Sequence, residues 1–79
     1  MSEYEWMNIF GDNLSDLLKE WGGTQEDLAN CIGTTQSAIS SYVNKERIPS
    51  LKNALNMSYE FGLTLDEFIG FFGEMIDIL

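Results

Sequence analysis

The sequence predicts an all-α protein, with five short helices packed into one compact domain. Apolar residues recur at three- and four-residue spacing along most of the chain, which is the period of an amphipathic helix. Glycines stand mainly between these periodic segments, and the chain contains a single proline. No stretch alternates polar and apolar residues in the way that a half-buried strand would. Together these observations favour a helical bundle over any fold with a sheet.

The first predicted helix opens at a capping box, in which Ser2 and Glu5 satisfy each other's backbone N–H groups. It ends at the Gly22-Gly23 pair, because glycine adopts the left-handed conformation of a helix C-cap at little cost. Its apolar face consists of Phe10, Leu14, Leu17, Leu18 and Trp21.

Two short helices follow, separated by a tight turn at Gly33. The first opens at a capping box of Thr24 and Asp27, and Thr35 caps the second. The small side chain of Ala29 allows the second helix to cross the first closely and at a steep angle. The apolar faces consist of Leu28, Ala29 and Ile32 in the first helix and of Ala38, Ile39, Tyr42 and Val43 in the second.

The last part of the chain predicts a loop and two further helices. Residues 44–50 are polar and contain the proline, so they form the loop. Ser50 caps a fourth helix that closes at Gly62, and Thr64 with Glu67 opens a fifth over residues 64–79. The residues at helical spacing are Leu51, Ala54, Leu55, Ser58 and Phe61 in the fourth helix and Leu65, Phe68, Ile69, Phe72, Met75 and Ile76 in the fifth.

Composition argues against an enzyme, a metalloprotein and a membrane protein. The 79 residues include one cysteine and no histidine, which removes the usual neutral-pH acid–base group and any cysteine-based metal cage. The apolar runs are far shorter than the roughly 20 residues that span a bilayer. Asp12, Asp16 and Glu20 recur at four-residue spacing, which indicates a solvated stripe. We therefore expect a cytoplasmic protein with no cofactor, no metal and no small-molecule substrate.

The net charge of −9 opposes nucleic-acid binding, but the charge is unevenly distributed. Residues 1–27 hold seven acidic residues and one basic residue, and residues 60–79 hold five acidic residues and no basic one. Residues 28–59 instead hold three basic residues and one acidic residue. Charges beyond a Debye length of about 8 Å are largely screened at physiological salt, so the middle segment can still attract an anion.

The outward face of the helix after Gly33 is polar and uncharged. It presents Gln36, Ser37, Ser40 and Ser41, which offer both hydrogen-bond donors and acceptors. A merely solvated face in so acidic a chain would more often carry glutamate and lysine. Amides and hydroxyls suit the major groove of DNA, where each base edge presents donors and acceptors.

The segment TQEDLANCIGTTQSAISSYVNKERIPS resembles the Cro/CI-type (Xre-like, lambda-repressor-like) helix-turn-helix family. The similarity extends over roughly residues 10–72, with the helix-turn-helix core at about residues 24–43. The resemblance implies a bundle of five helices in which the helix from Thr35 to Val43 lies in the major groove. By the same resemblance, Gln36, Ser37, Ser40 and Ser41 contact bases.

The resemblance also implies which side chains contact phosphates: Gln25, Thr35, Lys45, Arg47 and Lys52. The chain departs from the family pattern at two of its positions. Lys45 stands where many members have glycine, and a left-handed backbone there would cost about 1 kcal/mol. Ser41 stands where many members carry arginine or lysine. We therefore expect a shallow salt dependence, on the order of two to four ions per protomer.

The C-terminal segment carries more apolar residues than one short helix can bury. It either folds back onto the core or forms a two-fold interface with a second copy. We favour a homodimer, in which the interface consists of Phe71, Phe72, Met75 and Ile78.

The main hypothesis is a sequence-specific, dimeric transcriptional regulator of bacterial or phage type. It is expected to repress by occupying an operator in double-stranded DNA. The alternative is a protein-interaction module on the same fold, such as an antirepressor, a repressor modulator or an antitoxin-like partner. The acidic surface and the apolar C-terminus motivate this alternative. A nucleic-acid mimic is disfavoured because the acidic residues cluster at both ends of the chain.

Overall fold

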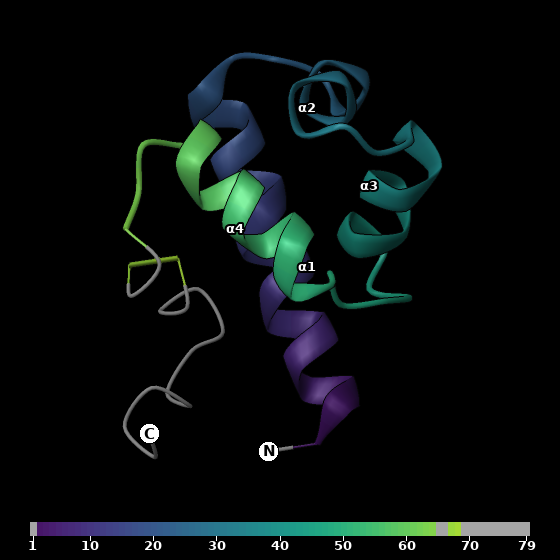
Figure 1. Ribbon diagram of the computed structural model, residues 1–79. Coiled ribbons are helices and arrows are strands. Elements are labelled where there is room, and N and C mark those ends of the chain that lie inside the picture. The colour runs from purple at the N-terminus through teal and green to yellow at the C-terminus, as the bar shows by residue number, and fades with distance from the viewer. Residues whose placement is uncertain (1, 65–66, 69–79) are drawn as a thin grey trace.

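The computed structural model describes residues 2–64 and 67–68, which form four helices (Figure 1). They are α1 (Glu3–Trp21), α2 (Gln25–Ile32), α3 (Gln36–Val43) and α4 (Leu51–Glu60). Each helix begins at a residue that the sequence predicts as its cap. The side chains of Ser2, Thr24, Thr35 and Ser50 each accept a hydrogen bond from the backbone N–H three residues later. The all-α prediction is confirmed, and the described residues form no strand.

Within residues 2–64 and 67–68 there are four helices, where the sequence predicted five over the whole chain. Most of the predicted fifth helix lies outside the described residues, which include only its first turn in part. The backbone N–H of Thr64 donates to the carboxylate of Glu67 at 2.9 Å, and the N–H of Glu67 donates to the Thr64 hydroxyl at 3.1 Å. These hydrogen bonds, the one from the Thr64 backbone above all, lower the pKa of Glu67. A capping box is a local feature, which shows where a helix can start and not how far it extends.

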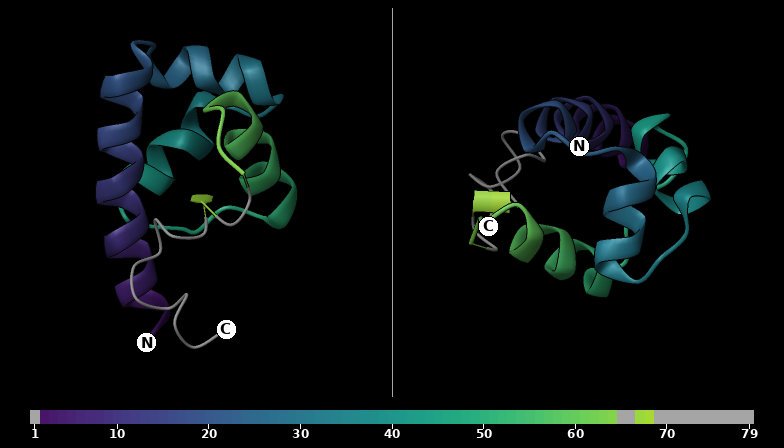
Figure 2. Two further views of the ribbon diagram at one scale, coloured as in Figure 1. Left: turned by 90° about the vertical axis from the view of Figure 1, so that its left-hand side faces the viewer. Right: turned by 90° about the horizontal axis from the view of Figure 1, so that it is seen from above.

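The hydrophobic core draws side chains from all four helices. Seen from above, the helices surround this core (Figure 2). Phe10 lies at its centre and makes edge-to-face contacts with Tyr42 and Phe68, at ring-centroid distances of 6.5 and 5.7 Å. Complete burial of such a side chain contributes about 1.5–3 kcal/mol. The other buried apolar residues are Leu14, Leu18, Leu28, Ala29, Ile32, Ile39 and Met57.

Helix α3 packs against both α1 and α2, and α4 packs against α2. The left view of Figure 2 shows α2 running across the end of α1 at a steep angle. The turn from α2 into α3 is made at Gly33, whose φ of +73° lies in the left-handed region. This turn brings α3 back against the buried side of α2, where Ala29 is 2% exposed. The packing of α3 against α2 confirms that these two helices lie close together, as the small side chain of Ala29 predicts.

The predicted buried face of α4 is partly wrong. Leu51 and Leu55 share helical spacing with Ala54 and Phe61 but are 71% and 42% exposed. Met57 is buried in their place. Met57 also lies at helical spacing from Ala54 and Phe61, so the period alone does not distinguish the two sets of residues. Ser58 is buried as expected, and its hydroxyl donates to the carbonyl oxygen of Leu55 at 2.7 Å.

Helix α1 passes very close to the end of α3 at Gly11. A Cβ atom at this position would lie 2.8 Å from the carbonyl oxygen of Tyr42 and 2.7 Å from Cγ of Lys45. Contact with the carbonyl oxygen would force the backbone to shift, because a backbone atom cannot rotate away as a side chain can. Gly11 therefore determines how closely α1 approaches the loop after α3. None of the helices in the described ranges is long and apolar enough to cross a membrane.

Candidate nucleic-acid interface

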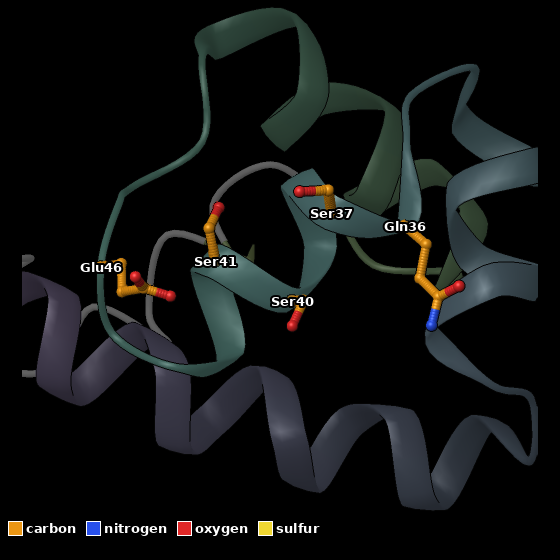
Figure 3. A pocket seen from close by; sticks show the side chains of 5 residues that line it. All are labelled: Gln36, Ser37, Ser40, Ser41 and Glu46. Atoms are coloured by element: carbon orange, nitrogen blue, oxygen red, sulfur yellow. The ribbon is translucent and has the colours of Figure 1, made fainter.

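The four predicted base-contacting residues lie together along one edge of an open groove of about 480 Å³ (Figure 3). Gln36 and Ser37 come from the first turn of α3, and Ser40 and Ser41 come from its second turn. Glu46, in the loop after α3, completes the lining of the groove. The figure shows Gln36 at one end of the row and Glu46 at the other. Helix α3 thus presents a polar face to solvent, with Ile39 and Tyr42 buried on its opposite side.

The two ends of this row differ in their hydrogen bonding. Both Gln36 and Ser37 are exposed, and the described part of the chain supplies no hydrogen-bond partner for either side chain. The hydroxyl of Ser41 donates to the carbonyl oxygen of Ala38 at 2.6 Å, so its proton is used within the helix. The hydroxyl of Ser40 accepts from the Asn44 amide at 3.2 Å and can still donate outward. The first turn therefore has the greater hydrogen-bonding capacity toward a ligand.

The N-termini of α2 and α3 offer different environments to a phosphate. Gln25 is half-buried at the start of α2, in a first turn that also contains Glu26 and Asp27. The carboxylate of Asp27 accepts from the backbone N–H of Thr24 at 2.9 Å, and this hydrogen bond lowers the pKa of Asp27. The positive end of the α2 dipole thus already faces a carboxylate, which competes with the phosphate contact expected at Gln25.

The first turn of α3 contains no acidic residue. Its cap, Thr35, is exposed, and the hydroxyl accepts from the backbone N–H of Ala38 at 3.1 Å. The hydroxyl proton remains available to donate to an anion. The positive end of this helix is thus the one that can face a phosphate.

The basic residues near the groove are held by different contacts. The ammonium of Lys45 lies 2.9 Å from the carboxylate of Asp12 in α1. The guanidinium of Arg47 lies over the ring of Tyr42 at 5.9 Å from its centroid. Lys52 is exposed in the first turn of α4 and does not line the groove. Asp12 is exposed, as the predicted solvated stripe implies, and it also pairs with one of the predicted phosphate contacts.

The loop after α3 begins with a left-handed residue that is not glycine. Lys45 has a φ of +66°, so the backbone takes the conformation that the family's glycine suggests. The N–H of Glu46 donates to the carbonyl oxygen of Ser41 at 2.9 Å, and the N–H of Lys45 donates to that of Tyr42 at 3.1 Å. These two bonds form a Schellman motif, in which glycine is the usual left-handed residue. Lysine there costs about 1 kcal/mol.

Glu46 lines this groove but was not among the site residues predicted from the sequence. A signal was present, because Glu46 is the one acidic residue between positions 28 and 59 and lies in the loop just after α3. The predicted dimer residues Phe71, Phe72, Met75 and Ile78 lie outside the described residues.

The crossing helices and the exposed polar face of α3 define a helix-turn-helix protein, a class of DNA-binding regulators. The helix-turn-helix family model matches residues 14–68, which is more than half of the chain. The chain therefore belongs to the Xre/Cro/CI-like helix-turn-helix family. No curated protein and no solved structure gives a significant match to the chain.

Proposed function

We propose that this protein is a sequence-specific transcriptional repressor of bacterial or phage type, which binds an operator through α3. The observation that supports this most directly is the neutral groove edge of α3, where Gln36 and Ser37 extend into solvent. An amide can donate to N7 and accept from N6 of adenine in bidentate fashion. Repression follows if the bound protein blocks access of polymerase to a promoter.

Three basic side chains near the groove support DNA binding. Lys45, Arg47 and Lys52 lie in the loop after α3 and at the start of α4, and we propose that they contact phosphates with Gln25 and Thr35. Lys45 must exchange the Asp12 carboxylate for a phosphate to do so. The affinity should therefore depend only weakly on salt, with a slope of about two to four ions per protomer. A slope as steep as that of a strongly basic binder would contradict this assignment.

The test is selection of binding sites from random duplexes, followed by measurement of affinity for the enriched site. We expect Gln36→Ala to weaken binding to that site by about 1–3 kcal/mol and to relax the preference at one base pair. Asn30→Ala is the matched control, because it truncates an exposed amide of α2 that does not line the groove. If both variants bind all duplexes as the wild type does, base reading by α3 is wrong.

We also propose that two copies bind a symmetric operator, with half-sites about 10 bp apart. The apolar residues Phe71, Phe72, Met75 and Ile78 are the proposed contact between the copies. Light scattering at micromolar concentration tests the dimer directly. A monomer both free and on DNA would contradict it.

A second candidate function is a protein-interaction module on the same fold. It is favoured by the net charge of −9 and by the Lys45–Asp12 pair, which engages one of the four basic residues. A gel shift on DNA upstream of the gene, set beside a pull-down with the products of neighbouring genes, separates the two functions. Capture of one such product without any gel shift at low salt would favour the second candidate.

A further inference from the structure

Glu46 is the one charged residue among those that line the groove of α3. Its carboxylate is directed toward the groove, at the end opposite Gln36 (Figure 3). The backbone is held in place, because the N–H of Glu46 donates to the carbonyl oxygen of Ser41 at 2.9 Å. The side chain is thus presented from an ordered turn at the end of the recognition helix.

The basic neighbours of Glu46 do not neutralise it. The ammonium of Lys45 lies 2.9 Å from Asp12, and the guanidinium of Arg47 lies over the Tyr42 ring. Within residues 2–64 and 67–68, no ion pair to the Glu46 carboxylate forms. A carboxylate that enters an interface without a partner loses its hydration with nothing in exchange. If Glu46 approaches DNA together with the rest of the row, it needs a hydrogen-bond donor there.

The major groove offers such donors only as exocyclic amino groups, on cytosine and adenine. Adenine places an acceptor, N7, beside its amino group, which suits an amide that both donates and accepts. Cytosine presents the N4 amino group as its hydrogen-bonding atom, which suits a carboxylate that can only accept. The chemistry of Glu46 therefore matches cytosine, just as that of Gln36 matches adenine.

We infer that Glu46 is a specificity-determining residue that accepts a hydrogen bond from the N4 amino group of a cytosine. This inference rests on the proposed function, because it requires α3 to lie in the major groove. Gln36 and Ser41 are five residues apart, or about 7.5 Å along the helix, which corresponds to about two base-pair steps. Glu46 lies beyond Ser41 from Gln36, so its cytosine is at least two base pairs from the base that Gln36 reads.

The experiment is the same selection from random duplexes, performed on the full chain with wild type, Glu46→Gln and Glu46→Ala. The wild type should enrich cytosine at one position of the half-site. Glu46→Ala should reduce the preference for cytosine by about tenfold. The base preference at the position read by Gln36 should not change. Glu46→Gln should shift the preference from cytosine toward adenine, because an amide replaces the carboxylate.

Glu20→Gln is the matched control, since it removes the same charge from an exposed residue of α1 that does not line the groove. Circular dichroism checks folding, and among the described residues Glu46 makes hydrogen bonds only through its backbone. If both Glu46 variants keep every base preference and merely bind all duplexes more tightly, the carboxylate only repels phosphates and the inference is wrong. A wild type that enriches no sequence would overturn the proposed function as well, which distinguishes the two failures.

Discussion

Helices α2 and α3 have eight residues each and both begin with a threonine cap followed by glutamine, yet their ends are built differently. The first turn of α2 carries Glu26 and Asp27, whereas the first turn of α3 carries no acid. The left-handed residue after α2 is a glycine, and after α3 it is Lys45.

The difference shows which of the two helices is optimised for stability. Acidic side chains in the first turn and a left-handed glycine after the last turn are the features that stabilise an isolated helix. Helix α2 has both features, and α3 has neither. Functional surfaces often forgo stabilising residues in this way, because the side chains there must meet a ligand. The following predictions test this contrast.

The largest effect is expected for Ser37→Glu, which gives α3 an acidic first turn like that of α2. The carboxylate should stabilise the helix by about 0.3–1 kcal/mol through the helix dipole. It should also weaken binding to the selected operator by at least about tenfold, because it meets DNA without a matching donor. Ser37→Gln is the neutral control of the same size and should bind within a few-fold of wild type. Tight binding by Ser37→Glu would show that this end of α3 does not face DNA.

Gly33→Ala should destabilise the protein by about 1–2 kcal/mol, because a Cβ atom is strained at a φ of +73°. Steric crowding is not the cause, since no described residue other than the chain neighbours has a heavy atom within 4 Å of the added Cβ. Chemical denaturation measures the loss. An unchanged denaturation midpoint would mean that the turn relaxes readily. The left-handed residue would then not distinguish the end of α2 from the end of α3.

Lys45→Gly should instead stabilise the protein. Relief of the left-handed strain contributes about 1 kcal/mol, and loss of the ion pair with Asp12 removes up to about 1 kcal/mol. The net gain in the free energy of unfolding is therefore about 0–1 kcal/mol. Lys45→Ala loses the same pair without relieving the strain, so the glycine variant should exceed it by about 1 kcal/mol. Equal stability of the two variants would contradict the strain at this position.

Asp12→Asn should raise the affinity for all duplexes by about two- to threefold, because it releases Lys45 to contact a phosphate. Fluorescence anisotropy with a labelled operator is sensitive enough to detect this change. Asp16→Asn is the control, because it removes the same charge one turn along α1. Asp16 forms no ion pair with Lys45. If both variants gain equally, the effect is general charge repulsion and not release of Lys45.

The smallest expected effect is the loss of the stabilising contribution of Asp27 at low pH. The pKa of Asp27 is lowered in the folded chain by its hydrogen bonds to Thr24, so its contribution is complete above the ordinary pKa of aspartate. The contribution disappears as the pH falls through the lowered value. Denaturation curves of wild type and Asp27→Asn should therefore converge as the solution is acidified from about pH 5 to pH 2. A gap that is independent of pH would contradict this coupling.

Local signals predicted the fold well. Each cap was found from one hydroxyl residue, and for α1 and α2 also from the acid three residues later, because a capping box involves only neighbouring residues. The buried face of α4 was harder to predict. Two sets of residues with helical spacing were available, and only packing against α2 decides between Leu55 and Met57.

The site was predicted from the side chains on one helix face, and those residues do lie together. Contacts between distant segments could not be predicted in the same way. The pair of Lys45 with Asp12 joins α1 to the loop after α3, and no periodicity in the sequence places these residues side by side. Glu46 enters the groove because of the turn at Lys45, which a helical pattern does not describe.

The absence of a side chain at Gly11 has a consequence for how this surface could evolve. Since the Tyr42 carbonyl oxygen would lie 2.8 Å from any Cβ there, a single added methyl group must push α1 and the loop apart. That push would act on the end of α3 that leads into Glu46, because the atoms nearest to the added Cβ belong to Tyr42, Val43 and Lys45. Position 11 therefore sets the distance between α1 and the loop after α3. Under the proposed function, a substitution there would change how Glu46 meets DNA without changing any residue that lines the groove.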